Sequence, residues 1–371
     1  MNVVYVITKA DEIGGAQVHV RDLAHAMKKD NHNVTVIVGE DGALVKQLKA
    51  MGVQTIILPS LIRNISPLKD ILCAYQLRKI INHIKPDIVT LHSSKAGIVG
   101  RLALIFSQIP VIFTAHGWAF AEGINERKRK TFIFIEWLFS YLVDKIITVS
   151  HQDKTLALKY KISSEDKQIV IHNGIPDFEN NINNLSNSKT DNIIRIITVA
   201  RFSEQKDHST LLKSFSLLKN KNWNLTLVGK GPLLPSIKNL AEELKIADKV
   251  SFLGERHDVE ELLKKSDIFI LSSDWEGLPI SIIEAMKQSL PVIASDVGGI
   301  NELVQNNESG FLIKRKDYIH MKEKLEILIE NESMRKEMGI QARKKYISDF
   351  TFNQMFTKTL NLYKSLIKAK K

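Results

Sequence analysis

The strongest constraint on the fold is an alternation of short, β-branched apolar runs with amphipathic helical patterns along nearly the whole chain of 371 residues. The first apolar run, residues 3–8, leads into a helical pattern at residues 16–29. Further strand-like runs in the first half lie at residues 33–38, 53–58, 87–91, 111–115 and 145–149. Repeated strand–helix units of this kind predict a parallel sheet with helices on both faces.

One interruption predicts a domain boundary. Asn173-Gly174-Ile175-Pro176 breaks the alternation, and the segment after it is rich in Asn and Ser, which is typical of a linker. A second series begins at residues 193–199 and continues through residues 223–228, 250–253, 268–271 and 291–294. We therefore predict an α/β fold of two Rossmann-like domains facing each other across a cleft. The expected parts are residues 1–176, a linker at 177–192, residues 193–350, and a last helix at 351–371 that completes the second domain or packs back on the first.

Composition narrows the class of protein. The single cysteine, Cys73, excludes an intrachain disulfide and a cysteine-based metal site, and fits a reducing, cytoplasmic compartment. Residues 1–7 read as a first strand and not as a signal peptide. The net charge of +11 fits nucleic acid, an anionic membrane or anionic small molecules as partners. The sequence contains no helix-turn-helix, RNA-binding aromatic signature or zinc finger, so we expect no nucleic-acid partner.

Two glutamates near residue 280 carry the most specific chemical information. Glu276 and Glu284 follow the strand-like run at residues 268–271, and Gly277 with Pro279 breaks the chain between strand and helix. Glu276 is therefore expected on a loop at the carboxyl end of a strand, and Glu284 in the first turns of a helix. Ligands bind at this edge of open α/β sheets. Carboxylates there can accept hydrogen bonds from the hydroxyls of a sugar or a ribose.

Basic residues and glycines occupy other strand ends. Arg201 and Lys206 follow the first strand of the second series and suit a diphosphate, although two solvated surface charges would look the same. Gly229-Lys230-Gly231 follows the next strand. Gly14-Gly15 lies between the first strand and the first helix, where glycine permits φ > 0 and the helix N-terminus favours an anion. The alternative for the Gly14-Gly15 pair is a tight strand–helix turn.

Histidines provide the remaining candidates. His116 follows a strand next to Gly117 and could donate to a sugar hydroxyl or a phosphate oxygen, or else cap backbone groups as a structural residue. His92 holds the equivalent place after an earlier strand, with less specificity. His19 and the other helix-borne histidines read as helix-face or surface residues. No pair has the spacing of a helical metal site, so no metal cluster is predicted.

Together these motifs resemble the retaining glycosyltransferases of family 4, which have the GT-B fold, and among them the bacterial capsule and exopolysaccharide enzymes. The resemblance covers nearly the whole chain. It rests above all on Glu276-Gly277-Leu278-Pro279 with Glu284. The other motifs that carry it are Gly14-Gly15, His116-Gly117, Asn173-Gly174-Ile175, Arg201 with Lys206, and Gly229-Lys230-Gly231.

The resemblance implies roles for these residues. Arg201 and Lys206 would hold the donor diphosphate and stabilise its charge as it leaves, without a metal ion. Glu276 would contact hydroxyls of the transferred sugar, and Glu284 would bind the ribose. His116 would lie beside the donor sugar. The other implied donor-binding positions are Gly14, Gly15, Gly229, Lys230, Gly277, Leu278, Gly298 and Gly299.

The implied reaction moves a sugar from a nucleotide-diphosphate donor, expected to be a UDP-sugar, to a lipid-diphosphate-linked or oligosaccharide acceptor in surface-polysaccharide synthesis. A nucleotide-sugar epimerase of the same fold is one alternative, against which the glutamate pair and the Arg201/Lys206 loop argue. A non-catalytic subunit that binds sugar nucleotides is another. Against the non-catalytic alternative, every polar position that the resemblance leads us to expect is occupied in this sequence.

A basic run beside an aromatic segment suggests a membrane contact. Residues 126–130 are charged and mostly basic, and residues 131–143 are rich in aromatic and apolar side chains, with Glu136 among them. Such a helix fits an interfacial contact with anionic lipid. The apolar segment is too short to span a bilayer. The alternative is a sheet-packing helix after a solvated loop. We expect a peripheral enzyme on the cytoplasmic face of the membrane.

Overall fold

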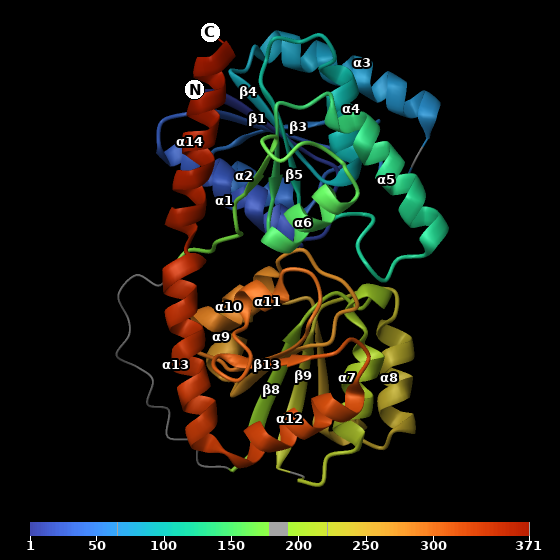
Figure 1. The fold of residues 1–371 in the computed structure, drawn as a ribbon, viewed down its shortest axis with the longest axis vertical. Helices are drawn as coiled ribbons and strands as arrows, with labels where there is room; N and C mark the ends of the chain where they lie inside the picture. Colours follow the sequence, from blue (N-terminus) through green and yellow to red (C-terminus); the bar gives the residue numbers. More distant parts are fainter. Residues whose placement is uncertain (65, 178–191, 221, 371) are drawn as a thin grey trace. The chain divides into compact units, whose positions relative to one another are not determined.

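The computed structural model describes residues 1–64, 66–177, 192–220 and 222–370 and divides the chain into two compact units (Figure 1). Unit 1 comprises Met1–Asn173 with Asn353–Lys371, and unit 2 comprises Gly174–Phe352. Each unit is a parallel sheet flanked by helices, which confirms the predicted pair of Rossmann-like domains. Most of the predicted linker, residues 178–191, lies outside the described residues.

Unit 1 contains a seven-stranded parallel sheet in the order β3-β2-β1-β4-β5-β6-β7. Its strands are β1 (Asn2–Ile7), β2 (Asn33–Val38), β3 (Gln54–Ile57), β4 (Ile88–His92), β5 (Val111–Ala115), β6 (Lys145–Thr148) and β7 (Gln168–Val170). Its helices are α1 (Gly15–Lys29), α2 (Ala43–Ala50), α3 (Pro67–Ile84), α4 (Ser94–Ala103), α5 (Glu126–Ser140), α6 (His151–Lys159) and α14 (Phe352–Lys370).

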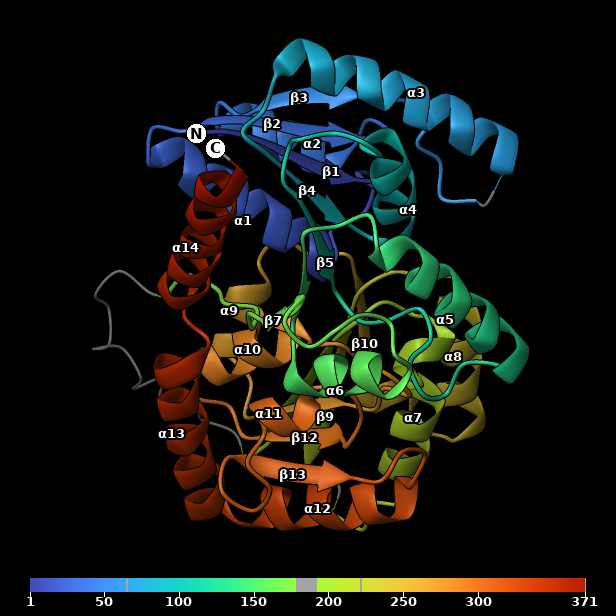
Figure 2. The same cartoon turned by 45° about the horizontal axis from the view of Figure 1, so that its top comes forward.

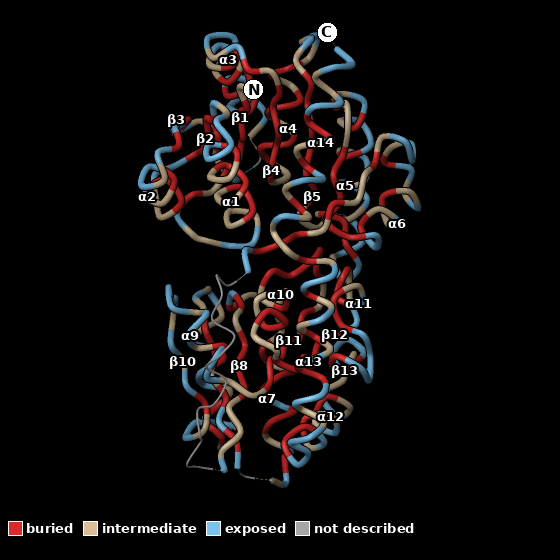
Figure 3. Tube along the Cα trace, turned by 90° about the vertical axis from the view of Figure 1, so that its left-hand side faces the viewer, coloured by how far each residue is buried: buried red, intermediate tan, exposed pale blue. Residues whose placement is uncertain are grey.

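The central strands of unit 1, β1, β4 and β5, are buried on both faces, as parallel strands between helices must be (Figure 3). Val4 and Val6 of β1 belong to one core with Leu77 of α3 and Val99 of α4. Figure 2 shows α3, α4 and α5 following one another over this part of the unit. Tyr5 is fully buried between Val4 and Val6 in the strand, so its side chain lies on the opposite face.

Unit 2 contains a six-stranded parallel sheet in the order β10-β9-β8-β11-β12-β13. Its strands are β8 (Ile194–Val199), β9 (Trp223–Val228), β10 (Val250–Gly254), β11 (Ile268–Leu271), β12 (Val292–Ser295) and β13 (Gly310–Ile313). Its α-helices are α7 (His208–Ser216), α8 (Leu234–Glu243), α9 (Val259–Lys264), α10 (Ile280–Lys287), α11 (Ile300–Leu303), α12 (Tyr318–Glu330) and α13 (Glu332–Asp349), with 3₁₀ turns η1 (Glu204–Lys206) and η2 (Ala247–Lys249). The sequence did not predict β7 or β13.

The C-terminal helix α14 packs on unit 1. Tyr363 at its centre is fully buried, and burial raises the pKa of its phenol to about 12. Near the end of the helix, Lys370 forms an ion pair with Asp144 at 2.9 Å, just before β6. The chain therefore leaves unit 1 after Asn173 and returns to it through α14.

Helix α5 differs from the expectation of a solvated basic loop before an aromatic helix. Residues 127–130 already lie in the first turns of α5, because Asn125 caps the helix by accepting a hydrogen bond from the Arg127 N–H at 3.1 Å. Glu136 does not face solvent, since its carboxylate accepts a hydrogen bond from the buried Arg101 guanidinium at 2.8 Å. Among the described helices, none combines the length and apolar character needed to cross a bilayer.

Candidate active site

An ion pair between Lys206 and Glu276 joins two loops at the carboxyl edge of the unit 2 sheet. Lys206 ends the 3₁₀ turn after β8, and Glu276 lies between the adjacent strand β11 and helix α10. The Lys206 ammonium donates to Glu276 Oε1, which also accepts a hydrogen bond from the Ser273 hydroxyl at 2.6 Å. The Glu276 side chain is only 6% exposed, against 16% for Lys206, so the carboxylate depends on these partners.

Further hydrogen bonds hold the two loops together. The Asp274 N–H donates to the Gln205 carbonyl at 2.7 Å, and the Gln205 amide donates to the Trp275 carbonyl at 2.8 Å. The Ser272 hydroxyl lies 3.1 Å from the Lys206 carbonyl and 2.9 Å from the Asp207 carbonyl. These contacts fix the backbone on both sides of the ion pair, so Lys206 and Glu276 are presented by a braced loop pair.

Glycine is required where backbones approach the site. Gly298 has φ +54°, and a Cβ built on it would lie 1.9 Å from the Glu276 carbonyl oxygen. Its neighbour Gly299 donates an N–H to the Gly277 carbonyl at 2.8 Å. Gly229 has φ +141°, and a Cβ there would lie 2.0 Å from the carbonyl oxygen of Ala200, the residue before Arg201. Gly298 and Gly229 thus allow close approach of strands and loops, because any side chain at either position would collide with backbone.

The remaining predicted residues of unit 2 lie on the segments that follow β8, β9 and β11. Arg201 directly follows Ala200 at the end of β8 and is exposed. Lys230 is half exposed and forms an ion pair with Glu255 at 2.6 Å. Leu278 is buried, and Glu284 lies in α10, partly buried, beside the buried Ile283. The expected loop position of Glu276 and helix position of Glu284 are therefore both observed.

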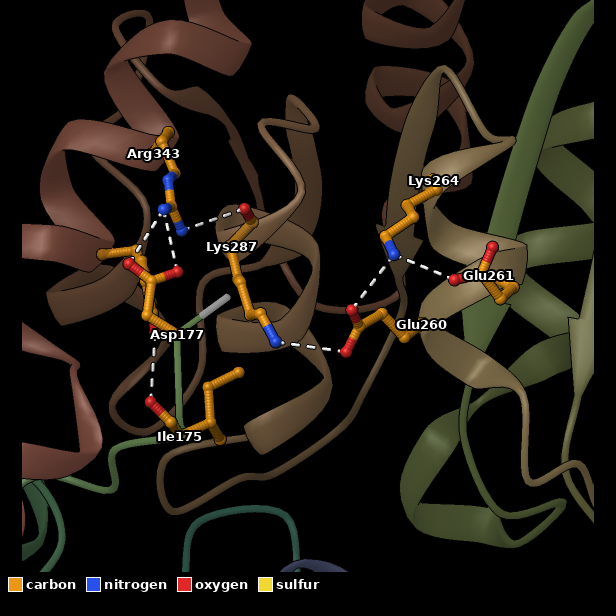
Figure 4. Close-up of polar contacts among 8 residues, drawn as sticks. Ile175, Asp177, Glu260, Glu261, Lys264, Lys287 and Arg343 are labelled. Atoms are coloured by element: carbon orange, nitrogen blue, oxygen red, sulfur yellow. Dashed lines mark hydrogen bonds and ion pairs between the residues drawn. The ribbon is translucent and has the colours of Figure 1, made fainter. Parts of the chain in front are cut away.

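A second polar network anchors α10, the helix that carries Glu284 (Figure 4). Lys287, its last residue, contacts Glu260 of α9 at 3.1 Å and its carbonyl accepts a hydrogen bond from Arg343 of α13 at 3.2 Å. Arg343 also pairs with Asp177 at 2.8 Å. Because α10 is tied to both α9 and α13, these two neighbouring helices hold α10, and with it Glu284, in place relative to the sheet.

In unit 1, three histidines from different elements meet. His116 follows β5, His92 ends β4, and His19 lies in α1. His92 Nδ1 and His116 Nε2 are 3.0 Å apart, and His92 Nε2 is 2.9 Å from the Thr90 hydroxyl. The ring of His19 meets that of His116 edge-on, with centroids 4.8 Å apart. His19 and His92 are buried, so of the two expected positions for His19, helix face or surface, it takes the helix face, on the inward side of α1.

Burial keeps this cluster neutral. Desolvation lowers the pKa of His19 to about 4 and lowers the pKa of His92 and of His116 well below the usual value. One proton is therefore shared between His92 Nδ1 and His116 Nε2, which makes His92 a positioning residue for the His116 ring. The three rings offer ligand atoms within 4.8 Å of one another, a cluster that no sequence spacing predicted. A metal would have to replace the His92–His116 hydrogen bond.

Gly14 and Gly15 do not use the positive φ that glycine permits. Gly14 caps α1 with φ −114°, and Gly15 is the first residue of the helix, so neither requires φ > 0. Both are exposed, and a Cβ on Gly14 would meet only the Gln17 side chain, at 3.2 Å. Their contribution is a helix N-terminus with no side chain at its first two positions, at the carboxyl edge of the unit 1 sheet, where the Gly14 N–H donates to Gln17 Oε1 at 3.2 Å.

Family models match both halves of the chain. Residues 13–177 match the model described as Glycosyltransferase Family 4, and residues 177–345 match Glycosyl transferases group 1. Among solved structures, Anabaena Alr3699/HepE in complex with UDP-glucose matches with a TM-score of 0.85 and 18% identity, over 98% of this chain and 100% of that one. That likeness supports the GT-B fold.

Curated relatives extend the match along the whole chain. O-antigen biosynthesis glycosyltransferase WbnH of Escherichia coli is 30% identical over 93% of this chain and 95% of its own length. The UDP-Gal:alpha-D-GlcNAc-diphosphoundecaprenol alpha-1,3-galactosyltransferase of Escherichia coli is 28% identical over 92% and 91%. The chain therefore belongs to glycosyltransferase family 4 and is a glycosyltransferase with the GT-B fold.

Proposed function

We propose that the protein is a retaining glycosyltransferase that moves a sugar from a UDP-sugar to a lipid-diphosphate-linked or oligosaccharide acceptor in surface-polysaccharide synthesis. The observation that carries the proposal is the Lys206–Glu276 pair, set beside Gly298 at the carboxyl edge of the unit 2 sheet. The names of the two Escherichia coli relatives support the proposal, because one names a UDP-linked donor and a diphosphoundecaprenol-linked acceptor and the other names O-antigen biosynthesis. The single cysteine supports a reaction in the cytoplasm.

Each group at the site has a chemical task in this proposal. Arg201 and Lys206 bind the donor diphosphate and stabilise the negative charge that develops as it leaves. Glu276 accepts hydrogen bonds from hydroxyls of the transferred sugar, and Glu284 from the ribose. Gly298 and Gly299 let the backbone approach the donor, as do Gly229 and Gly277.

From unit 1, we assign His116 to the transferred sugar. Its ring is neutral and held by His92, so it can form a hydrogen bond with a sugar hydroxyl without adding charge. The N-terminus of α1 at Gly14 and Gly15 suits a phosphate or a hydroxyl of the acceptor. Lys230 and Leu278 complete the proposed donor-contacting set.

The proposed reaction keeps its charges in balance without a protein nucleophile. The bond between the anomeric carbon and the diphosphate oxygen breaks, leaving positive charge on the sugar and negative charge on the diphosphate. The acceptor hydroxyl attacks from the same face, and its proton passes to the departing phosphate oxygen. Because Glu276 already accepts hydrogen bonds from Lys206 and Ser273, we assign it to binding. A covalent sugar adduct on Glu276, seen by mass spectrometry with a slow donor analogue, would contradict this assignment.

A donor screen tests the proposal. The protein is incubated with a panel of nucleotide sugars, with and without a lipid-diphosphate acceptor, and products are identified by mass spectrometry. Transfer should need an acceptor and a UDP-sugar, and Lys206→Ala should lose about 10²–10³-fold in kcat. Lys213→Ala, an exposed lysine on α7, is the matched control and should retain full activity. A donor converted to its epimer without acceptor would overturn the proposal.

A further inference from the structure

Helices α3 and α5 carry apolar side chains on the face that points away from the sheet. Both helices repeat the same spacing, in which the exposed positions are i, i+3, i+4 and i+7. On α3 these residues are Leu68, Ile71, Leu72 and Tyr75, and from α5 to its C-cap they are Phe134, Trp137, Leu138 and Tyr141. Leu68 is 84% exposed. Each helix already has an inner apolar face in the core, so these outer stripes are additional.

Glu126, in the first turn of α5, is exposed and pairs with Arg129 at 2.9 Å, whereas the other carboxylates of these two helices are turned inward. Asp70, the one carboxylate of α3, is buried and ion-paired with Lys95 of α4. Glu136 of α5 is buried and pairs with Arg101, also of α4, at 2.8 Å. Helix α4 therefore supplies both cations from its place between α3 and α5 (Figure 2). The outer stripes are therefore free of negative charge. This arrangement has a cost, because both partners of a buried ion pair lose their contact with water.

Phe106 adds a strained, exposed aromatic side chain next to α3. It is 91% exposed and has φ +62°, a backbone conformation that disfavours a bulky side chain and favours Asn or Gly. The segment before it is tied to α3, because the Arg78 guanidinium donates to the carbonyls of Ala103 at 3.3 Å and Ile105 at 2.9 Å. Residues held in such conformations cluster at functional sites.

We infer that unit 1 docks on an anionic lipid bilayer through this surface, here called the α3–α5 face: the two stripes and Phe106. Charge complementarity selects the partner, because the charged side chains exposed on α3 are Lys69 and Lys79, and the first turns of α5 carry four basic residues, 127–130, against one acidic residue, Glu126. Lys79 also lies over the Tyr75 ring at 4.6 Å. Aromatic residues beside cations suit the headgroup region of anionic membranes.

A second copy of the chain fits this face less well. In a two-fold symmetric dimer the same patch meets itself, so the basic residues of α3 and α5 would face one another and repel. The inference rests on the proposed function in one respect: a lipid-linked acceptor would reach the enzyme at the membrane that this surface contacts. Vesicle binding is measured without sugar transfer, so the docking inference and the proposed function can fail separately.

Co-sedimentation with vesicles tests the inference. We expect the full chain to bind vesicles that contain phosphatidylglycerol, to bind pure phosphatidylcholine weakly, and to be released by salt. Phe106→Asn should weaken binding about ten-fold, because an apolar ring leaves the interface. The same substitution should raise the thermal unfolding midpoint by about 2–4 °C, because Asn tolerates the backbone conformation. If Phe106 instead stabilised the fold by packing, Phe106→Asn would lower the thermal unfolding midpoint.

Charge and control variants complete the experiment. Lys69→Gln and Lys79→Gln should each weaken binding to the anionic vesicles about five-fold. Leu217→Asn removes a 45% exposed leucine from unit 2 and should leave binding unchanged. Transfer to a short-chain, water-soluble acceptor should be unaffected by Phe106→Asn. If that transfer is absent in the unmodified protein, the proposed function fails, whatever the vesicles show.

Two results would overturn the inference. One is equal sedimentation of the unmodified protein and of Phe106→Asn with anionic vesicles at low salt. The other is a concentration-dependent dimer in sedimentation velocity that Phe106→Asn and Leu68→Asn abolish, since a second copy would then cover the face. Reduced vesicle binding with a monomer throughout supports the inference.

Discussion

At the residue scale, the Lys206–Glu276 pair makes an asymmetric prediction. Lys206→Ala leaves a carboxylate that is only 6% exposed without its cation, whereas Glu276→Gln leaves an ammonium that can turn to solvent. We expect Lys206→Ala to lower the free energy of unfolding by about 3 kcal/mol and Glu276→Gln by about 1 kcal/mol. Urea unfolding measures both. Equal losses of unfolding free energy in the two variants would contradict this prediction, because the Glu276 carboxylate would then reach water as easily as the Lys206 ammonium.

The glycines at the site allow a matched pair of substitutions. Gly298 and Gly254 both have positive φ, +54° and +66°, but only at Gly298 would a Cβ collide with neighbouring backbone. Gly254→Ala should therefore cost about 1–2 kcal/mol from backbone conformation alone. Gly298→Ala should cost about 3 kcal/mol or more and also lower kcat, because Glu276 must move. Similar stability losses would contradict the close-approach argument.

Sequence reasoning at this scale succeeded where one short segment sets the geometry. The Glu-Gly-Leu-Pro setting placed Glu276 on a loop and Glu284 on a helix, and both positions are observed. It could not predict the ion pair with Lys206, because the two residues are 70 positions apart in the sequence and meet only because strands β8 and β11 are adjacent in the sheet. The positive φ that glycine permits is not used at Gly14 and Gly15, because a helix start also accommodates glycine in an ordinary conformation.

At the element scale, the cluster of His19, His92 and His116 joins α1, β4 and β5 and predicts a pH effect on stability. The pKa of His19 is lowered to about 4 in the folded chain, against about 6.5 when unfolded. Between those values the unfolded chain binds a proton that the folded chain does not, so stability falls as pH falls. From about pH 7 to pH 5, His19 alone should account for about 2 kcal/mol.

Urea unfolding at these two pH values tests this. His19→Gln should lose less stability on acidification than the unmodified protein does. His83→Gln, which changes an exposed histidine near the end of α3, is the control and should behave like the unmodified protein. A pH response unchanged by His19→Gln would show that His19 is not held neutral by burial.

Helix α14 makes a prediction about which unit it stabilises. Tyr363 is fully buried against unit 1, so Tyr363→Ala should lower the stability of that unit by about 3–5 kcal/mol. Hydrogen exchange should show faster opening in the sheet of unit 1 and little change in unit 2. Asn361→Ala, at an exposed position of the same helix, is the control. Loss of protection confined to unit 2 would contradict the placement of α14.

Elements with strong periodic patterns were predictable, and short ones were not. The expected strands at 33–38, 111–115 and 223–228 are observed with the same bounds. Strands β7, of three residues, and β13, of four, are too short to give a pattern of their own and are defined by pairing with β6 and β12. The histidine cluster escaped prediction for the same physical reason, since tertiary contacts alone bring its members together.

At the scale of the whole molecule, two Rossmann-like units were predictable because the strand–helix alternation restarts after residue 192. That the units face each other across a cleft stays a prediction. So does independence from metal, in which Arg201 and Lys206 balance the diphosphate charge. Chelation with EDTA should leave kcat unchanged. A loss of activity restored by a divalent cation would contradict metal independence and would direct attention to the histidine cluster.

The central claim is transfer of a sugar from UDP with retention at the anomeric carbon, driven from the Lys206–Glu276 site. The most direct measurement is proton NMR of the product formed from an α-linked UDP-sugar and a lipid-diphosphate acceptor. The proposal predicts a product with the α anomeric coupling, formed by the unmodified protein and lost about 10²–10³-fold in Lys206→Ala. A β-linked product, or an α-linked product formed equally well by Lys206→Ala, would contradict it.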